Sequence, residues 1–368
     1  MRKAIAVLLC VALLSTASLA APPPDKTAWQ VFLKLTAPAP GAKAVAFETW
    51  ASDSDIFTAR PHWPGLPHNV LLRSLAAAAA EHAMGGSASQ TSESCYPKGG
   101  AAGNFPKAPP ADACIGEEVM HNRAIFDAIL AANLFTQAGL AQNFLRAKPI
   151  RFPGDSIVVK ADWIAVTDIL RWLPNAYKSA SEVRRAYYTN TATFNGQRGE
   201  YALAGMSLQS RQQDDWVWST FEQRSNPGRC DVIGCHDAFG AVIADVAPQP
   251  GTNSDYGPCA KSPALAVLFA RAGLDPVWSN YCLKGTQTRF VTPSGQPTIL
   301  ANSVIERMNK GVAVEQTSCI TCHAYASFDR TGAANYAVLK PPPTGAVDKE
   351  LLNGFKAYDY MWGFLAAH

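Results

Sequence analysis

The sequence predicts an α+β fold in which helical regions surround a small antiparallel sheet, with much irregular structure between them. Three observations lead to this prediction. Strand-like segments of alternating polarity cluster in the middle of the chain, and segments with apolar residues at helical spacing lie on both sides of them. Proline and glycine, with 26 residues each among 368, predict many turns.

Residues 1–20 have the features of a secretory signal peptide. Two basic residues precede the apolar run 4–14, and the small residues at 18–20 fit a cleavage site. We therefore expect residues 21–368 to form a single compact protein, exported to a bacterial periplasm or to the outside of the cell. No later segment has the roughly 18 apolar residues of a membrane-spanning helix, so no membrane insertion is expected after cleavage.

The first part of the mature chain is predicted to be mainly helical. Residues 28–57 predict a short helix followed by a strand or loop, and Leu71 to Met84 an alanine-rich helix. Residues 85–110 are rich in Gly, Ala, Ser and Pro, which is typical of a surface loop. Glu117 to Ala147 has apolar residues at helical spacing, interrupted at Gly139.

The middle of the chain predicts the sheet. Strand-like segments rich in β-branched and aromatic residues are separated by turn residues, including Asn195-Gly196. The predicted strands cover residues 156–163, 186–194, 200–208 and 216–221. Trp216 and Trp218 alternate with Val217 and are expected to point to one face.

The last third of the chain is predicted to return to helices. Residues 262–272 form a helix ended by Gly273, and residues 298–309 form a second one. Residues 350–367 have apolar side chains at helical spacing and predict a final amphipathic helix.

Charge and motifs exclude several classes of function. The 32 Lys and Arg against 29 Asp and Glu give a formal net charge of +3, so no nucleic-acid partner is expected. With 48% hydrophobic and 17% charged residues, the chain is not expected to be disordered. The nucleotide-binding, nucleophile-elbow and zinc-protease motifs G-x-x-x-x-G-K, G-x-S-x-G and H-E-x-x-H do not occur.

Nine cysteines occur, of which Cys10 lies in the predicted signal peptide. The other eight are an even number in an exported chain, which is compatible with disulfide pairing. Proximity in the sequence suggests three pairs, and connectivity cannot be deduced from sequence alone. These pairs are Cys95–Cys114, Cys230–Cys235 and Cys259–Cys282.

The remaining two cysteines form a motif with a neighbouring histidine. Cys319-Ile-Thr-Cys322-His323 is C-x-x-C-H, the attachment pattern of a c-type haem. Two thiols at this spacing add to the two vinyl groups of one porphyrin, and the histidine becomes the proximal ligand of the iron. A structural zinc site would need four ligands, and no second motif supplies them. The predicted cofactor is therefore haem c, with residues 297–368 as the attachment region.

A second motif leaves two alternatives open. Cys230 and Cys235 are followed by His236 in the spacing C-x4-C-H, which some multihaem cytochromes use. The favoured interpretation is a short disulfide in a turn rich in Pro and Gly, with His236 exposed. The alternative is a second haem site.

The C-x-x-C-H motif resembles that of c-type cytochromes. In small cytochromes of this kind the motif comes early in the domain and a methionine loop follows it, whereas this chain has no Met between His323 and its last predicted helix. More of the chain is similar to exported bacterial proteins known only as cytochrome c family proteins of unknown function. The similar stretches are residues 158–163, 216–222 and 318–324. The resemblance implies a haem and names no substrate.

The function depends on the sixth ligand of the iron. A methionine or histidine in that position predicts an electron carrier, while an open position allows peroxidase or oxygenase chemistry. Met361 and Met206 are candidate ligands. Glu222 and Arg224 predict either an acid/base pair beside the haem or an exposed ion pair at a strand end.

The favoured hypothesis is a periplasmic monohaem cytochrome that passes single electrons to a redox partner protein. A haem enzyme and a dihaem protein are the alternatives.

Overall fold

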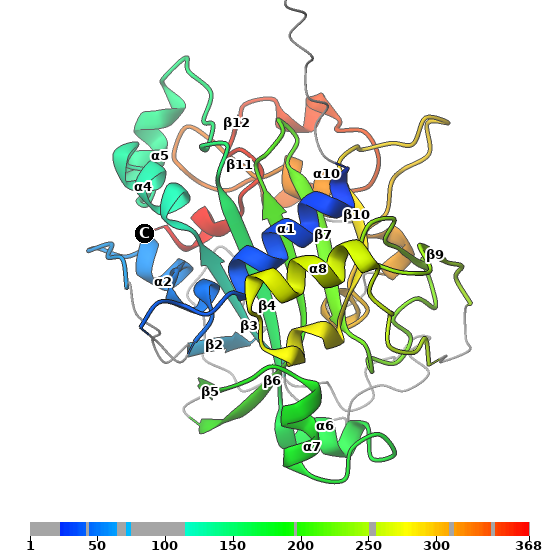
Figure 1. Ribbon diagram of the computed structural model, residues 1–368. Helices are drawn as coiled ribbons and strands as arrows, with labels where there is room; N and C mark the ends of the chain where they lie inside the picture. Colours follow the sequence, from blue (N-terminus) through cyan, green and yellow to red (C-terminus); the bar gives the residue numbers. More distant parts are fainter. Residues whose placement is uncertain are drawn as a thin grey trace, which may run out of the picture.

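One mostly antiparallel sheet of eight strands organises the protein, and the fold is α+β, as predicted (Figure 1). The computed structural model describes residues 23–41, 44–64, 71–74, 115–194, 197–249, 255–308, 313–339 and 343–367. The strands of the sheet are β1 (Ala51–Ser52), β2 (Leu71–Ser74), β3 (Ile115–His121), β4 (Ile157–Ala165), β5 (Thr189–Phe194), β6 (Gln197–Ser210), β7 (Val217–Gln223) and β10 (Tyr281–Gln287). Strand β4 pairs with β3 and β6, and β2 joins β3 to β5, so these five strands close a ring at one end.

Short helices and two small ribbons complete the structure. The ribbons pair β8 (Cys235–His236) with β9 (Asp245–Val246), and β11 (Ser327–Phe328) with β12 (Lys356–Ala357). The α-helices are α1 (Pro24–Thr36), α2 (Asp53–Ile56), α4 (Arg123–Ala131), α5 (Gln137–Phe144), α6 (Val166–Trp172), α7 (Ala180–Ala186), α8 (Pro263–Ala272), α9 (Ile305–Met308) and α10 (Cys319–Ala324). The 3-10 helices are η1 (Ala46–Thr49), η2 (Pro276–Asn280), η3 (Val314–Gln316), η4 (Tyr336–Leu339), η5 (Lys349–Leu352) and η6 (Gly363–Ala366).

Helices α1 and α8 lie side by side across one face of the sheet (Figure 1). Trp29 and Phe32 of α1 pack there on Phe221 of β7, with ring centroids 4.9 and 4.5 Å away. Burial of such aromatic side chains contributes most of the apolar area of a core. We call this side of the sheet the α1 face.

The opposite face carries two further apolar clusters. One is formed by α4, α5 and the end of the chain, and includes Trp216, Trp218 and Tyr358. The other lies under α6 and α7. This side, the far face, is the one against which α10 is held. In the described part of the chain, no helix combines the length and the apolar character needed to cross a bilayer.

Several predicted elements are confirmed. The predicted strands at 156–163, 200–208 and 216–221 correspond to β4, β6 and β7. The predicted helix 262–272 is α8. The Ser262 hydroxyl accepts from the N–H of Leu265 at 3.2 Å, and Gly273 ends the helix with a φ of 61°. Serine before a helix and glycine after it are the local signals that made this prediction possible.

Three predictions near the sheet are wrong at their boundaries. The segment 117–121 is strand β3 and not helix, and the helix begins only after Asn122, whose side chain accepts from the N–H of Ile125 at 3.4 Å. Leu71–Ser74 is strand β2, while the rest of that predicted helix lies outside the described residues. The strand predicted from Ala186 starts at Thr189. Pairing with neighbouring strands overrides helical spacing in the first two cases.

The two helices predicted near the end of the chain are largely wrong. Of residues 298–309, only Ile305–Met308 is helical, because the preceding segment binds to the sheet instead. Residues 350–367 hold only η5, β12 and η6. Positive φ angles at Gly354 (82°), Asp359 (47°) and Tyr360 (71°) interrupt any continuous helix. The N–H of Phe152 donates to the buried Asp359 carboxylate at 2.7 Å, which stabilises this turn.

Candidate functional site

Strand register places a row of side chains across the far face, and the C-x-x-C-H motif lies against it. Residues directly opposite each other on paired strands project to the same face. Trp218 is opposite Gln209 on one side and Gln287 on the other, so all three lie in one row. The His323 ring has its centroid 4.7 Å from that of Trp218. The motif therefore faces the sheet surface opposite α1.

Gln287 fixes the start of the motif helix on this row. Its side-chain oxygen accepts from the N–H of Ile320 at 2.9 Å, and its amide nitrogen lies 2.9 Å from the Ser318 hydroxyl. Thr321 adds a hydrogen bond to the carbonyl of Gly345 at 2.7 Å. Because α10 has only six residues, its position depends on these contacts more than on its own helical bonds.

The His323 ring is oriented by the end of the chain. Its Nδ1 lies 2.9 Å from the backbone carbonyl of Tyr360. A carbonyl oxygen only accepts, so Nδ1 donates and the neutral ring keeps its lone pair on Nε2. This is the tautomer that a metal-binding histidine needs, and metal-bound histidines commonly donate their other N–H to a carbonyl or carboxylate. The role of Tyr360 could not be predicted from the sequence, since any residue type supplies the same backbone acceptor.

The two thiols of the motif are not joined in a disulfide. Cys319 and Cys322 are free and half-buried, and the Cys319 thiol donates to the carbonyl of Leu300 at 3.2 Å. Burial raises the pKa of Cys322 to about 11 and that of Cys319 well above its ordinary value. Redox-active C-x-x-C pairs lower the pKa of a thiol to make it nucleophilic. The opposite shift here disfavours a dithiol oxidoreductase.

A layer of charged side chains, four buried and two (Lys160 and Glu306) half-buried, lies next to the motif on the far face. Its members come from β3, β4, β7, β10 and α9, and we call them the buried charge cluster. They are Glu117, Lys160, Asp162, Glu222, Lys284 and Glu306. Lys160 Nζ lies 2.7 Å from Glu117, and Lys284 Nζ lies 3.1 Å from Glu222. Strand register brings these side chains together. Asp162 of β4 is opposite Glu117 of β3 on one side and Gly205 of β6 on the other, and Gly205 is in turn opposite Glu222 of β7.

The environment changes the protonation of this cluster. Burial raises the pKa of Asp162 well above its ordinary value, and the charge of Glu117 adds to the effect. Burial also raises the pKa of Glu306, to about 7, against the opposing attraction of Lys160. For Lys160, burial alone would lower the pKa, but the charges of Glu117 and Asp162 outweigh it and raise the value.

Glu222 differs from both sequence-based predictions for it. Its side chain is fully buried, so an exposed ion pair at a strand end is wrong. Its partner is Lys284 and not Arg224, and it also accepts from the backbone N–H of Ser303 at 2.7 Å and from the Ser303 hydroxyl. These bonds hold the segment before α9 on the sheet, where a helix was predicted.

The two methionines proposed as sixth ligands lie in different places. Met206 is buried on the α1 face, opposite Phe221 and Ala161 in the strand register. The sheet separates it from His323, which removes Met206 from the candidate ligands. Met361 is buried on the far face and follows Tyr360, which contacts the Nδ1 edge of His323. The nitrogen that would hold the iron is Nε2, on the other edge of the ring, so this position disfavours Met361.

The remaining predicted cysteine pairs can be placed in part. Disulfides join Cys230 to Cys235 and Cys259 to Cys282, with Cα atoms 5.1 and 5.9 Å apart. The ring of His236 forms a hydrogen bond with the Asp245 carboxylate, and this bond raises the pKa of His236. The first disulfide leaves no thiol for a second haem, which favours the monohaem hypothesis. Cys95, Cys114, the turn Asn195-Gly196 and the predicted signal peptide 1–20 lie outside the described residues.

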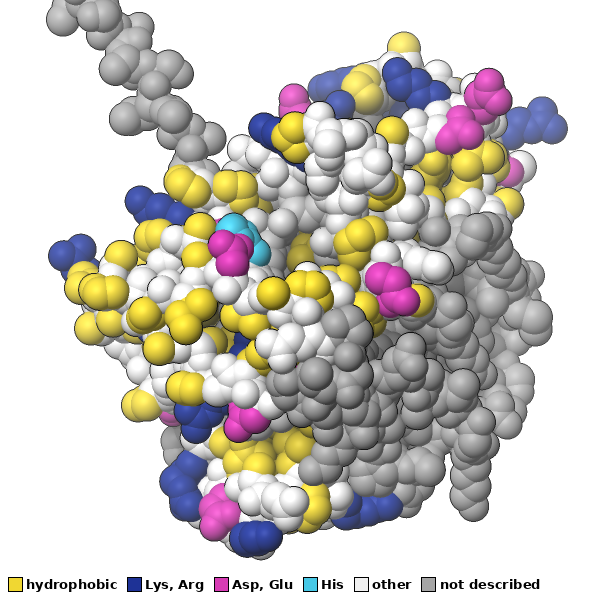
Figure 2. Space-filling view, turned by 90° about the vertical axis from the view of Figure 1, so that its right-hand side faces the viewer, with side chains coloured by type: hydrophobic (Ala, Val, Ile, Leu, Met, Phe, Trp, Pro, Cys, Tyr) yellow, Lys and Arg dark blue, Asp and Glu magenta, His cyan; other side chains and the backbone are white. Residues whose placement is uncertain are grey.

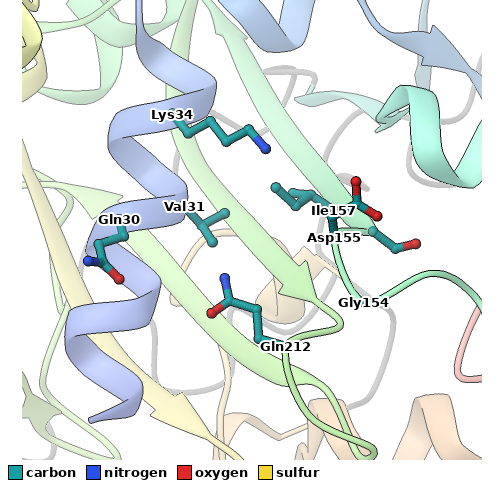
Figure 3. Close-up of a pocket in the computed structure, with 8 residues that line it drawn as sticks. Gln30, Val31, Lys34, Gly154, Asp155, Ile157 and Gln212 are labelled. Carbon is teal, nitrogen blue, oxygen red and sulfur yellow. The ribbon is translucent and has the colours of Figure 1, made fainter. Parts of the chain in front are cut away.

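A hollow of about 320 Å³ lies elsewhere, between α1 and the start of β4 (Figure 3). Lys34 and Val31 border it from the helix, and Gln212 from the opposite loop. Its lining residue Ile157 belongs to the cluster on the α1 face, so the hollow is separate from His323. On the side of the molecule in Figure 2, the Lys and Arg side chains of the described residues are dispersed among apolar ones.

Within the described ranges, no group of three or more His, Cys, Asp or Glu side chains is arranged to hold a metal ion. Family models, curated proteins and solved structures contain no match to this chain.

Proposed function

We propose that this protein is a periplasmic monohaem c-type cytochrome that carries single electrons. Cys319 and Cys322 would hold the haem through two thioether bonds, and His323 would be the proximal ligand of the iron. When bound, the haem supplies an iron centre that accepts and donates one electron. The observation that carries the proposal is the pairing of a C-x-x-C-H motif with a hydrogen bond from His323 Nδ1 to Tyr360.

The residues around the motif fit this role. Neither thiol is in a disulfide, as thioether formation requires, and the tautomer of His323 puts the ring's lone pair on Nε2, the nitrogen that would hold the iron. The Trp218 ring packs against the imidazole, and the indole N–H of Trp362 donates to the carbonyl of Cys322 at 3.2 Å. Rigid support of the ligand keeps its geometry the same in both oxidation states, which favours rapid electron transfer.

Haem content tests the proposal. The full chain would be exported in a host that matures c-type cytochromes, and the ratio of haem to protein measured by pyridine haemochrome. We expect a ratio near one, haem that stays with the protein after denaturation, and a mature chain that starts at Ala21 by mass spectrometry. A ratio near zero would refute the proposal.

Cysteine variants identify the attachment site. C319A/C322A should lose the covalent haem, whereas the matched control C230A/C235A should keep a ratio near one. A wild-type ratio near two that falls to one in C230A/C235A would instead support the dihaem alternative. Carbon monoxide distinguishes the haem enzyme: a reduced spectrum that CO leaves unchanged supports the electron carrier, and rapid CO binding with peroxide turnover supports the enzyme.

A further inference from the structure

The buried charge cluster contains more acids than bases. It has four carboxyl groups and two ammonium groups, and the two lysines are engaged by Glu117 and Glu222. Among the described residues, neither Asp162 nor Glu306 has an ion pair of its own. Asp162 is fully buried, and neither of its carboxyl oxygens has a hydrogen-bond partner among the described residues. An unpaired carboxylate is costly to bury, so burial raises the pKa of both groups and favours their protonated forms.

One short segment connects this cluster to the motif. The carbonyl of Leu300 accepts from the Cys319 thiol at 3.2 Å, and two residues later the N–H of Asn302 donates to the Glu306 carboxylate. The charges of Glu306 and Lys160 also act on both thiols. Charge in the cluster and charge at the motif therefore influence each other across buried, weakly screened surroundings.

We propose that Glu306 takes up one proton from solvent when the haem at Cys319 and Cys322 is reduced, so that the protein couples proton uptake to electron transfer. This inference rests on the proposed function. A one-electron donor protein would supply the electron to the bound haem, while the Glu306 carboxylate would bind one proton to become a carboxylic acid. Oxidation reverses both changes. The added electron and the added proton balance, so the buried region keeps its net charge.

The surroundings of Glu306 favour this titration. The charged and titratable groups that act on it are Lys160 and Asp162 of β4, Lys284 of β10, and Cys319 and Cys322 of α10. Glu117 of β3 and Glu222 of β7 are the ion-pair partners of the two lysines. Burial brings the pKa of Glu306 to about 7, so it titrates near neutral pH. An added electron nearby stabilises the protonated form and raises this pKa further in the reduced protein.

The test is the pH dependence of the reduction potential of the haem-loaded protein. One proton per electron gives a fall of about 59 mV per pH unit, the equivalent of a tenfold change in proton activity for a one-electron couple. We expect wild type to approach this slope around neutral pH and Glu306→Gln to lose it. The matched control is Glu315→Gln, an exposed carboxylate in the connection before α10, which should keep the wild-type slope.

A second readout does not depend on how well that variant folds. In the infrared difference spectrum between reduced and oxidised wild-type protein, we expect a carboxylic-acid C=O band that shifts in heavy water. Glu306→Asp should move this band. A flat potential in wild type, an unchanged slope in Glu306→Gln or a missing band would each overturn the inference. If the chain carries no haem, the proposed function itself fails, and the haem ratio shows this independently.

Discussion

Replacing Gln287 with leucine should destabilise the protein by removing the attachment of α10 to the sheet. Gln287 is 3% exposed. Its oxygen accepts from Ile320 at 2.9 Å, and its nitrogen lies 2.7–2.9 Å from Thr298 Oγ1, the Thr298 carbonyl and Ser318 Oγ. An amide has two N–H donors, so at most three of these four bonds form together. At about 1 kcal/mol each, their loss costs about 3 kcal/mol.

Urea unfolding of the haem-loaded protein measures this cost. The free energy of unfolding should fall by about 2–4 kcal/mol in Gln287→Leu, since leucine fills a similar volume but leaves the buried N–H of Ile320 unsatisfied. The control is Gln316→Leu, an exposed glutamine three residues before the motif, which should change stability by less than about 0.5 kcal/mol. A Gln287→Leu cost as small as that of the control would refute the hydrogen-bond reasoning.

Three further predictions concern stability. Replacing Cys259 and Cys282 with alanine opens a loop with a sequence separation of 23 and should lower the free energy of unfolding by about 3 kcal/mol, measured in urea; an unchanged midpoint would contradict this. Glu222→Gln removes the carboxylate charge that faces the buried Lys284 and should cost about 3–5 kcal/mol by the same assay, and a loss below about 1 kcal/mol would count against the ion pair. Burial lowers the pKa of Lys261 to about 7, whereas in the unfolded chain it is about 10.4. Between these two pH values the unfolded chain binds more protons than the folded protein, so the free energy of unfolding should rise with pH. Lys261→Met should flatten this rise in thermal melts at a series of pH values, and an unchanged slope would show that other groups cause it.

The two proposals rest on different observations, and the second can fail while the first stands. The haem proposal depends on residues close together in the sequence, Cys319, Cys322 and His323. The proton proposal depends on Glu306 and on side chains of four strands that only the sheet brings together. A haem-loaded protein whose potential is independent of pH would keep the first and remove the second.

Local signals in the sequence determined part of the fold. Helix α8 was predicted because Ser262 and Gly273 mark its ends, and both act on neighbouring backbone groups. Strands β4, β6 and β7 were predicted from their β-branched and aromatic content. The motif residues Cys319, Cys322 and His323 were found because thioether attachment fixes their spacing along the chain.

Only the tertiary structure decided the rest of the site. Residues 117–121 have helical spacing but form β3, since strands on both sides satisfy their backbone groups. The segment 350–367 has helical spacing too, but contacts to Asp359 and the carbonyl of Tyr360 hold it in turns. The buried charge cluster joins residues from 117 to 306 through strand register, and its burial shifts their protonation. Spacing along a chain determines which bonds neighbours can make, whereas burial and long-range pairing arise only once the sheet has assembled.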